Sequence, residues 1–260
     1  MGTAERIAFL RASLARAGLQ GKEEQTRVAL GHPGADACLR GGILRGALHE
    51  IFPAKAGDEP SATGFAAALA ARVAGKKRVL WLRLDFAALE DGEISATGLL
   101  ELGLDPARFL LLKAPDCSSV LRAALDALSC AALGTLVAEI PGTPKILDLA
   151  ASRRLVLAAA QTEVTAFLVR AHAQAGPSAA ETRWLVRPQH SQAGNENWGG
   201  PLLATELVRN RHGRTGHWVM EWNGDDGRFR AADPGVAVSA AADRPAATEN
   251  PNAARFSRVA

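Results

Sequence analysis

The sequence predicts an α/β domain: a mostly parallel central sheet flanked by helices, followed by an antiparallel β segment. Three observations lead to this prediction. Apolar runs of strand length alternate with helical segments between residues 47 and 170. The run Arg78–Leu84 is almost continuously apolar, which is typical of a parallel strand buried on both faces. Beyond residue 180, strand-like segments are joined by turns of the hairpin type.

Residues 1–30 are predicted to form an N-terminal helix and a linker. Ile7, Leu10 and Leu14 fall on one stripe of a helix over residues 3–20, and glycines at 18 and 21 end it. These side chains, together with Phe9, make self-association through the helix one hypothesis. Docking of the helix onto the chain's own core is the other.

Residues 31–230 are predicted to form the main unit. A glycine-rich stretch over 31–46 leads to strand Ala47–Phe52, a polar loop Lys55–Gly64 and a small-residue helix Phe65–Ala74. The strands and helices that follow alternate regularly: strand Arg78–Leu84, helix Ser95–Leu102, strand Phe109–Leu112, helix Val120–Ala131, strand Thr135–Ile140, helix Ala150–Gln161 and strand Thr165–Arg170. Such alternation indicates βαβ units.

The C-terminal part is predicted to contain three antiparallel strands and a tail. The strands are Thr182–Arg187, Leu203–Arg209 and His217–Trp222. Trp218 and Trp222 alternate on one face with a methionine between them, which favours a core face; the alternative is stacking on bases of single-stranded DNA. Residues 231–260 carry prolines among alanines without an apolar period, and we expect them to be disordered.

Composition excludes several classes of protein. The 260 residues are 48% hydrophobic and 22% charged, which describes a globular chain and not a mainly disordered one. No apolar run approaches the roughly 20 residues of a membrane span, so no membrane association is expected. The three cysteines lack metal-binding or disulfide spacing, which favours a reducing cytoplasm and argues against a metal site. A net charge of +3 permits contact with nucleic acid without requiring it.

The first strand–helix connection is where a phosphate-binding loop would lie. Such a loop needs the pattern G-x-x-x-x-G-K-S/T, whose amides, lysine and hydroxyl hold phosphates and magnesium. The chain offers Lys55, Gly57, Ser61 and Thr63, and nowhere contains Gly-Lys followed by Ser or Thr. The acidic residues at 58 and 59 would repel phosphates. The sequence therefore predicts a degenerate loop, no cofactor and no catalytic residue.

Several segments, taken in order, resemble RecA-type recombinases over about residues 30–190. They are Gly41–Gly46, His49–Phe52, Trp81–Asp85 and Leu136–Glu139. The resemblance implies a RecA-like core. It places Asp85 at the position of the catalytic carboxylate and Glu139 at that of the magnesium-linked one. Without the phosphate-loop lysine, both carboxylates are interpreted as vestigial or as caps of the turns that follow their strands.

The altered phosphate loop, the segment Glu206–Gly216 and the Pro/Ala tail together resemble the ImuA family. The resemblance implies a non-catalytic accessory protein of translesion synthesis in SOS mutagenesis, located in the cytoplasm and at the nucleoid when bound to DNA. It implies binding to the polymerase-like protein ImuB and, through ImuB, an indirect link to the error-prone C-family polymerase. RecA and DNA are further candidate partners. The alternatives are a SulA-like inhibitor of cell division and a divergent RecA-type ATPase that uses Asp85 and Glu139.

Two groups of arginines are candidates for contact with DNA or a partner. Arg153 and Arg154 begin a helix that lies beside a DNA-binding loop in the RecA order, and Arg209, Arg211 and Arg214 surround a hairpin tip. Cations at these positions would release counterions from DNA and make binding sensitive to salt. A solvated hairpin tip is the alternative for the second group.

The tail carries one large apolar side chain between charges. If the tail binds a partner, we expect Phe256 to be the anchor, with Arg255 and Arg258 beside it. A segment of this composition can bind a partner although it does not fold alone.

Overall fold

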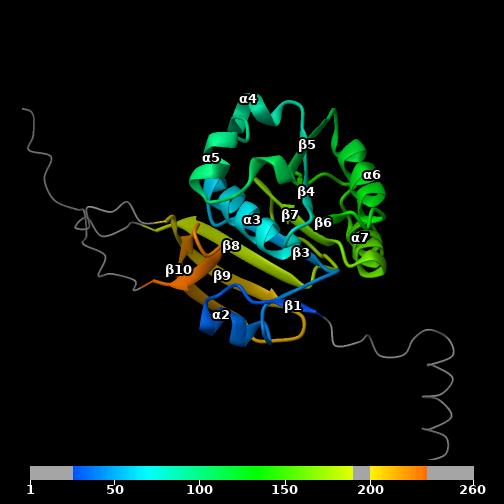
Figure 1. The fold of residues 1–260 in the computed structure, drawn as a ribbon. Coiled ribbons are helices and arrows are strands. Elements are labelled where there is room, and N and C mark those ends of the chain that lie inside the picture. Colours follow the sequence, from blue (N-terminus) through cyan, green and yellow to red (C-terminus); the bar gives the residue numbers. More distant parts are fainter. Residues whose placement is uncertain (1–25, 190–199, 233–260) are drawn as a thin grey trace, which may run out of the picture.

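The computed structural model describes residues 26–189 and 200–232, and a nine-stranded sheet forms its centre (Figure 1). The strand order is β11-β10-β9-β8-β3-β7-β6-β4-β5. Strands β8 to β5 in this order are parallel, whereas β9, β10 and β11 are antiparallel to their neighbours. Their bounds are β3 Leu48–Pro53, β4 Arg78–Leu84, β5 Phe109–Ala114, β6 Leu133–Glu139, β7 Thr165–Val169, β8 Thr182–Pro188, β9 Leu202–Asn210, β10 Gly216–Asn223 and β11 Arg228–Ala231.

The predicted fold class, a mostly parallel sheet with antiparallel C-terminal strands, is confirmed. One strand differs in direction: β8 runs parallel to β3 and antiparallel to β9, so it is the last parallel strand, where the sequence predicted an antiparallel one. A separate two-stranded sheet pairs β1 (Arg27–Val28) with β2 (Ile43–Leu44).

Helices cover both faces of the large sheet. Figure 1 shows α3 on one face, with α6 and α7 on the other. The helices are α2 (Pro33–Cys38), α3 (Glu59–Ala74), α4 (Ala87–Asp91), α5 (Ala96–Glu101), α6 (Cys117–Leu128) and α7 (Leu149–Thr162), with a 3₁₀ turn η1 at Pro106–Arg108. None of the helices in the described ranges is both long and apolar enough to cross a bilayer.

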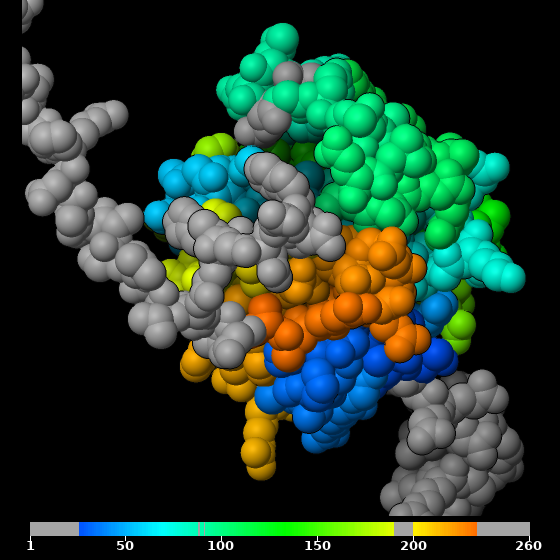
Figure 2. Space-filling view, turned by 60° about the vertical axis from the view of Figure 1, so that its left-hand side comes forward, coloured from blue at the N-terminus to red at the C-terminus, as the bar shows by residue number. Residues whose placement is uncertain are grey.

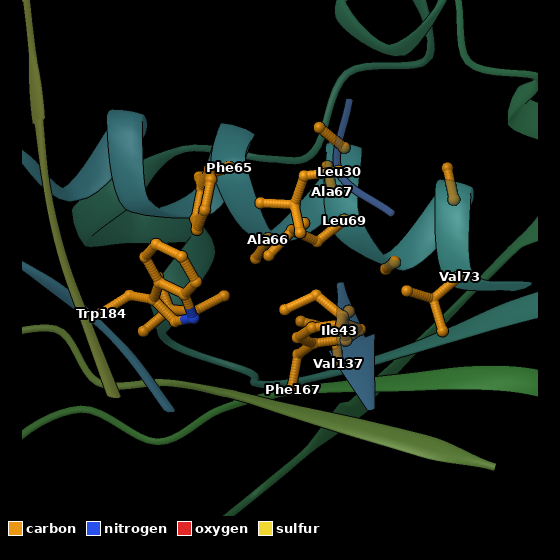
Figure 3. Packing of buried hydrophobic residues seen from close by; sticks show 14 of the residues in the cluster. Leu30, Ile43, Phe65, Ala66, Ala67, Leu69, Val73, Val137, Phe167 and Trp184 are labelled. Carbon is orange, nitrogen blue, oxygen red and sulfur yellow. The ribbon is translucent and has the colours of Figure 1, made fainter. Parts of the chain in front are cut away.

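Helix α3 is the centre of the larger core (Figure 3). Phe65 packs against Trp184 and Phe229 at centroid distances of 5.5 and 5.2 Å, and the alanines on either side of it are buried. A helix that is apolar on nearly all sides has to be covered on nearly all sides. The sheet covers one side of α3, and residues near α5, including Leu99 and Leu104, belong to the same cluster.

Helix α3 begins six residues earlier than the sequence predicted, at Glu59 instead of Phe65. Pro60 lies in the first turn, where its missing N–H would have no helical partner anyway. The carboxylate of Glu59 lies at the same end, which the helix dipole favours. The second part of the segment interpreted as a polar loop, from Glu59 to Gly64, is therefore the start of the helix, and only Lys55 to Asp58 form a turn.

The C-terminal strands close the α3 face of the molecule. Met220 and Trp222 are buried, as expected for a core face, and Trp218 is half-buried beside them. The Trp222 indole donates a hydrogen bond to the Leu102 carbonyl at 2.7 Å. Figure 2 shows β10 and β11 in orange, with α2 in blue on one side and the segment around α5 in green on the other. The hydrogen bond from Trp222 to Leu102 ties the end of α5 to the sheet.

Candidate functional site

The carboxyl ends of β3, β4, β6 and β7 meet at one edge of the sheet, which is where parallel α/β proteins place ligands. A cavity of about 630 Å³ lies at this edge. Its walls come from the turn after β3, the first half of α3, strand β4, residues 87–102 and the ends of β6 and β7. Its size is that of a pocket for a small molecule or a few side chains.

Two amides of the turn between β3 and α3 are hydrogen-bonded within the turn itself. Gly57, at φ 93°, donates its N–H to Oε2 of Glu59 at 2.7 Å. The N–H of Asp58 is directed to the Lys55 carbonyl at 3.2 Å. Amides that a phosphate-binding loop leaves free for phosphate oxygens are here bonded within the turn. The Glu59 carboxylate thus accepts the Gly57 N–H in the way that a bound anion would.

Two acidic residues follow the last glycine of the turn. In the phosphate-loop pattern a lysine and a hydroxyl residue hold these two positions, whereas this chain has Asp58 and Glu59. Asp58 is buried, and its Oδ2 has no hydrogen-bond partner. Glu59 Oε1 lies 3.4 Å from Nδ1 of His172. The charge at this helix terminus is therefore opposite to that of a phosphate site.

The predicted loop residues do not converge on one point. Thr63 and Gly57 line the cavity, whereas Lys55 is exposed and Ser61 lies outside the lining. Within the part of the chain that the structure describes, no cluster of three or more His, Cys, Asp or Glu side chains could hold a metal ion.

Glu139 at the end of β6 is held by two side chains of β4. The Trp81 indole donates to Oε1 at 2.8 Å, and Nε of Arg83 lies 3.2 Å from Oε2. Arg83 is 3% exposed and also donates to the Gly92 carbonyl at 2.8 Å. The carboxylate that the RecA resemblance assigns to magnesium is therefore part of an ion pair.

Asp85 does not join Glu139 in the cavity. Its side chain is exposed and lies outside the lining, and its N–H donates to the Ala114 carbonyl at 2.9 Å. Arg83, two residues earlier, contacts Glu139 instead. Sequence reasoning missed Arg83, although a charged residue inside the apolar run Arg78–Leu84 was a signal for a buried partner.

The lining of the cavity carries more carboxylates than cations. Among the described residues, its lining contains one cation, Arg83, and four carboxylates: Glu59, Glu90, Glu93 and Glu139. Lys113 on β5 forms an ion pair with Glu93. Apolar side chains make up most of the remaining wall: Ala62, Ala67, Ala87, Trp81, Ile94, Leu99, Leu102 and Val169.

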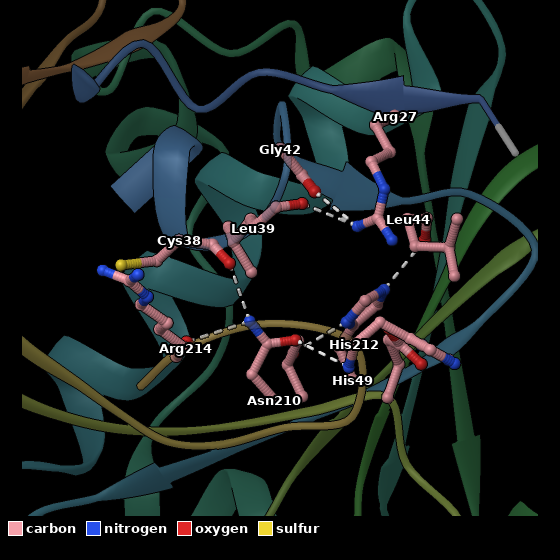
Figure 4. A network of polar contacts seen from close by, with 11 residues as sticks. Arg27, Cys38, Leu39, Gly42, Leu44, His49, Asn210, His212 and Arg214 are labelled. Atoms are coloured by element: carbon pink, nitrogen blue, oxygen red, sulfur yellow. Dashed lines mark hydrogen bonds and ion pairs between the residues drawn. The ribbon is translucent and has the colours of Figure 1, made fainter. Parts of the chain in front are cut away.

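The β9–β10 hairpin is fixed by Asn210 (Figure 4). Its Nδ2 donates to the carbonyls of Cys38 and Arg214 at 2.9 and 3.0 Å, and its Oδ1 accepts from the His212 N–H at 3.3 Å. The His212 ring lies 2.7 Å from a carboxylate oxygen of Glu181. The hairpin tip is thereby attached to α2 and to the start of β8.

The predicted contact arginines fall into two groups on different elements. Arg211 and Arg214 are exposed at the hairpin tip, and Arg209 is half-buried on β9. Burial and the neighbouring Arg183 and Arg211 lower the pKa of Arg209. Arg153 and Arg154 are exposed on α7. The structure does not place the two groups on one element.

The predicted tail residues Arg255, Phe256 and Arg258 lie outside the described residues, as do the N-terminal residues proposed for self-association.

Comparison with known proteins shows similarity to curated relatives in sequence and to solved structures in fold. Over 211 residues the chain is 29% identical to Protein ImuA of Caulobacter vibrioides, in strains NA1000 / CB15N and ATCC 19089 / CIP 103742 / CB 15; the match covers 75% of this chain and 82% of the relative. The crystal structure of the RadB recombinase superimposes with a TM-score of 0.53 at 15% identity, covering 79% of this chain and 100% of that one. No protein-family model matches.

The parallel sheet and the edge at which its cavity lies define a protein of the RecA-type α/β class, and the likeness to RadB shows that fold. Within this class its sequence is similar to that of Protein ImuA over three quarters of the chain. The resemblance indicated by the sequence motifs is confirmed.

Proposed function

We propose that the chain is a non-catalytic accessory protein of DNA-damage-induced mutagenesis. It acts as an adaptor that binds the polymerase-like protein ImuB and, through it, recruits the error-prone C-family polymerase. RecA and DNA are its further contacts, and it works in the cytoplasm and at the nucleoid. The similarity to ImuA supports this role.

The acidic start of α3 is the observation that supports a non-catalytic role. Asp58 and Glu59 follow Gly57, and the Glu59 carboxylate accepts the Gly57 amide. A triphosphate at this place would meet carboxylates instead of a lysine, and the Gly57 amide just before the helix is already bonded. The Arg83–Glu139 ion pair also competes with any magnesium ion for the Glu139 carboxylate.

The exposed arginines supply two candidate contact surfaces, Arg211 with Arg214 at the hairpin tip and Arg153 with Arg154 on α7. In the described part of the chain, no carboxylate forms an ion pair with any of these four side chains. Cations free of such pairing can neutralise DNA phosphates or acidic groups of a partner. The double variants Arg211→Ala/Arg214→Ala and Arg153→Ala/Arg154→Ala separate the two surfaces. Arg187→Ala, an exposed arginine of β8, is the matched control.

The test is capture of the ImuB-like protein of the same organism by the full chain, together with damage-induced mutation in a deletion strain. We expect capture, and loss of induced mutation that the wild-type gene restores. One double variant should weaken capture while Arg187→Ala leaves it unchanged. Absence of capture together with unchanged mutation would refute the proposal. Filamentous cells on overexpression would then favour the cell-division inhibitor.

A further inference from the structure

The cavity at the sheet edge has the chemistry of a binding site for a positively charged, apolar peptide. Its walls are mostly apolar, and four carboxylates with one arginine line it. Arg83 is paired with Glu139 and Lys113 with Glu93, while Glu59 Oε1 accepts no hydrogen bond and lies 3.4 Å from Nδ1 of His172. A ligand that buries an apolar side chain and brings cations to these carboxylates fits both features.

The chain itself contains such a segment. Residues 255–259 read Arg-Phe-Ser-Arg-Val, an aromatic side chain with an arginine on each side. We propose that this cavity binds the chain's own C-terminal segment Arg255–Val259, with Phe256 against the apolar wall and the two arginines near the carboxylates. These residues lie outside the described part of the chain.

The connection is long enough and starts on the correct side. Twenty-two residues separate Ala232, the last described residue, from Arg255, and an extended chain of that length spans about 70 Å. Phe229 on β11 pairs with Trp222, whose indole bonds to the carbonyl of Leu102, a residue of the cavity wall. The tail therefore follows directly on β11, which pairs with β10, the strand whose Trp222 contacts this wall.

The N-terminal segment is the competing occupant, because it also combines Phe9 with arginines. It enters the fold at β1, where Arg27 donates to the carbonyls of Leu39 and Gly42 beside α2. None of these three residues lines the cavity. Position in the fold thus favours the tail.

The contact is separate from the proposed function, because it requires no partner and is measured on the purified full chain. The readout is hydrogen–deuterium exchange of the backbone amides of residues 92–102, which form one wall. At an effective concentration of about 1 mM, a segment with a Kd of about 0.1 mM would be bound about 90% of the time and would slow this exchange about tenfold.

The variant Arg255→Ala/Phe256→Ala/Arg258→Ala should therefore raise exchange in this wall about tenfold. Phe9→Ala and Arg244→Ala, an arginine of the tail outside the segment, are the matched controls and should leave it unchanged. A synthetic peptide of residues 250–260 at about 1 mM should restore protection to the triple variant. Glu90→Gln/Glu93→Gln should weaken that restoration.

Unchanged exchange in the triple variant, with no effect of the peptide, would overturn the proposal. Faster exchange in Phe9→Ala instead would assign the cavity to the N-terminal segment and also overturn it. Protection that grows with protein concentration would mean that a second copy supplies the tail, which contradicts the intramolecular contact.

Discussion

His49 lies inside β3 at the centre of a chain of hydrogen bonds that requires a neutral ring. Its Nε2 lies 2.9 Å from the Leu44 carbonyl and must donate, because a carbonyl only accepts. Its Nδ1 then accepts from the Thr182 hydroxyl at 2.8 Å, and that hydroxyl accepts from the Trp184 indole at 3.0 Å. Every partner is satisfied without a second ring proton.

Burial lowers the pKa of His49 from 6.5 to about 4. Between these values the unfolded chain binds a proton that the folded chain does not, so the free energy of unfolding falls as pH drops. The loss attributable to His49 is about 3 kcal/mol between pH 7.5 and pH 4. Urea denaturation at several pH values should show this loss, and a smaller one in His49→Gln. An equal loss in both proteins would contradict the assignment.

Arg83 and Glu139 make a second prediction at the residue scale. Arg83→Met should leave the largely buried Glu139 carboxylate without its ion-pair partner, and breaking such a pair costs about 3 kcal/mol. Arg83→Met/Glu139→Gln removes both charges and should recover part of that loss. Chemical denaturation of both variants and of Glu139→Gln completes the cycle. A double variant less stable than either single variant would refute the pairing.

The sequence could place Glu139 at a strand end but could not identify its partner. The RecA resemblance directed attention to Asp85, because that residue ends the strand. The partner is Arg83, because β4 pairs with β6 in a register that joins Leu82 to Ala138 and so brings the next residues, Arg83 and Glu139, side by side. Asp85 lies on the same face of the strand but two residues farther along. Register is set by pairing between segments that are far apart in the sequence. Local sequence patterns carry no information about that pairing.

At the scale of elements, the backbone at the end of α5 packs directly against the backbone of the β10–β11 turn. Gly103 has φ 70°, and a Cβ on it would lie 2.4 Å from the carbonyl oxygen of Gly224. Gly103→Ala should therefore move the end of α5 away from the strands and destabilise the fold by about 2 kcal/mol. Thermal unfolding measures this. Gly227→Ala is the control, because Gly227 also has positive φ (58°), but a Cβ on it would have no atom within 4 Å.

If Gly103→Ala were no less stable than Gly227→Ala, steric contact with Gly224 would not constrain this join. Equal effects would leave only the strain of positive φ, which the two positions share.

The sequence predicted whether a segment is a helix or a strand better than it predicted which segments pair with one another. Strand β4 has the predicted bounds, because a buried parallel strand is a continuous apolar run. The start of α3 was missed because Asp58, Glu59 and Pro60 look like a turn, although each fits the first turn of a helix. The direction of β8 was also missed, because its burial alternates along Thr182–Pro188, which is the pattern typical of an antiparallel strand with one more exposed face.

At the scale of the molecule, the sheet edge combines a RecA-type position with acidic chemistry. The fold brings the turn after β3, the end of β6 and the segment before α5 around one cavity. The acidic pair Asp58–Glu59 was visible in the sequence as a departure from the phosphate-loop pattern. Glu90 and Glu93 join the same wall only through the packing of α4 and α5, so the overall charge of the cavity could not be read from local motifs.

This charge leads to the last prediction, that the chain does not bind nucleoside triphosphates. A ligand that binds the folded state raises the melting temperature by an amount set by RT ln(1 + [L]/Kd). ATP with magnesium at about 1 mM should shift the melting temperature by less than about 1 °C, because a Kd far above that concentration adds little stability. Glu59→Gln is the informative variant, since it removes the carboxylate on the Gly57 amide and would expose any hidden affinity. A saturable shift of several degrees in the parent chain, lost in Glu139→Gln, would contradict this prediction, and phosphate release from ATP would then test for a divergent ATPase.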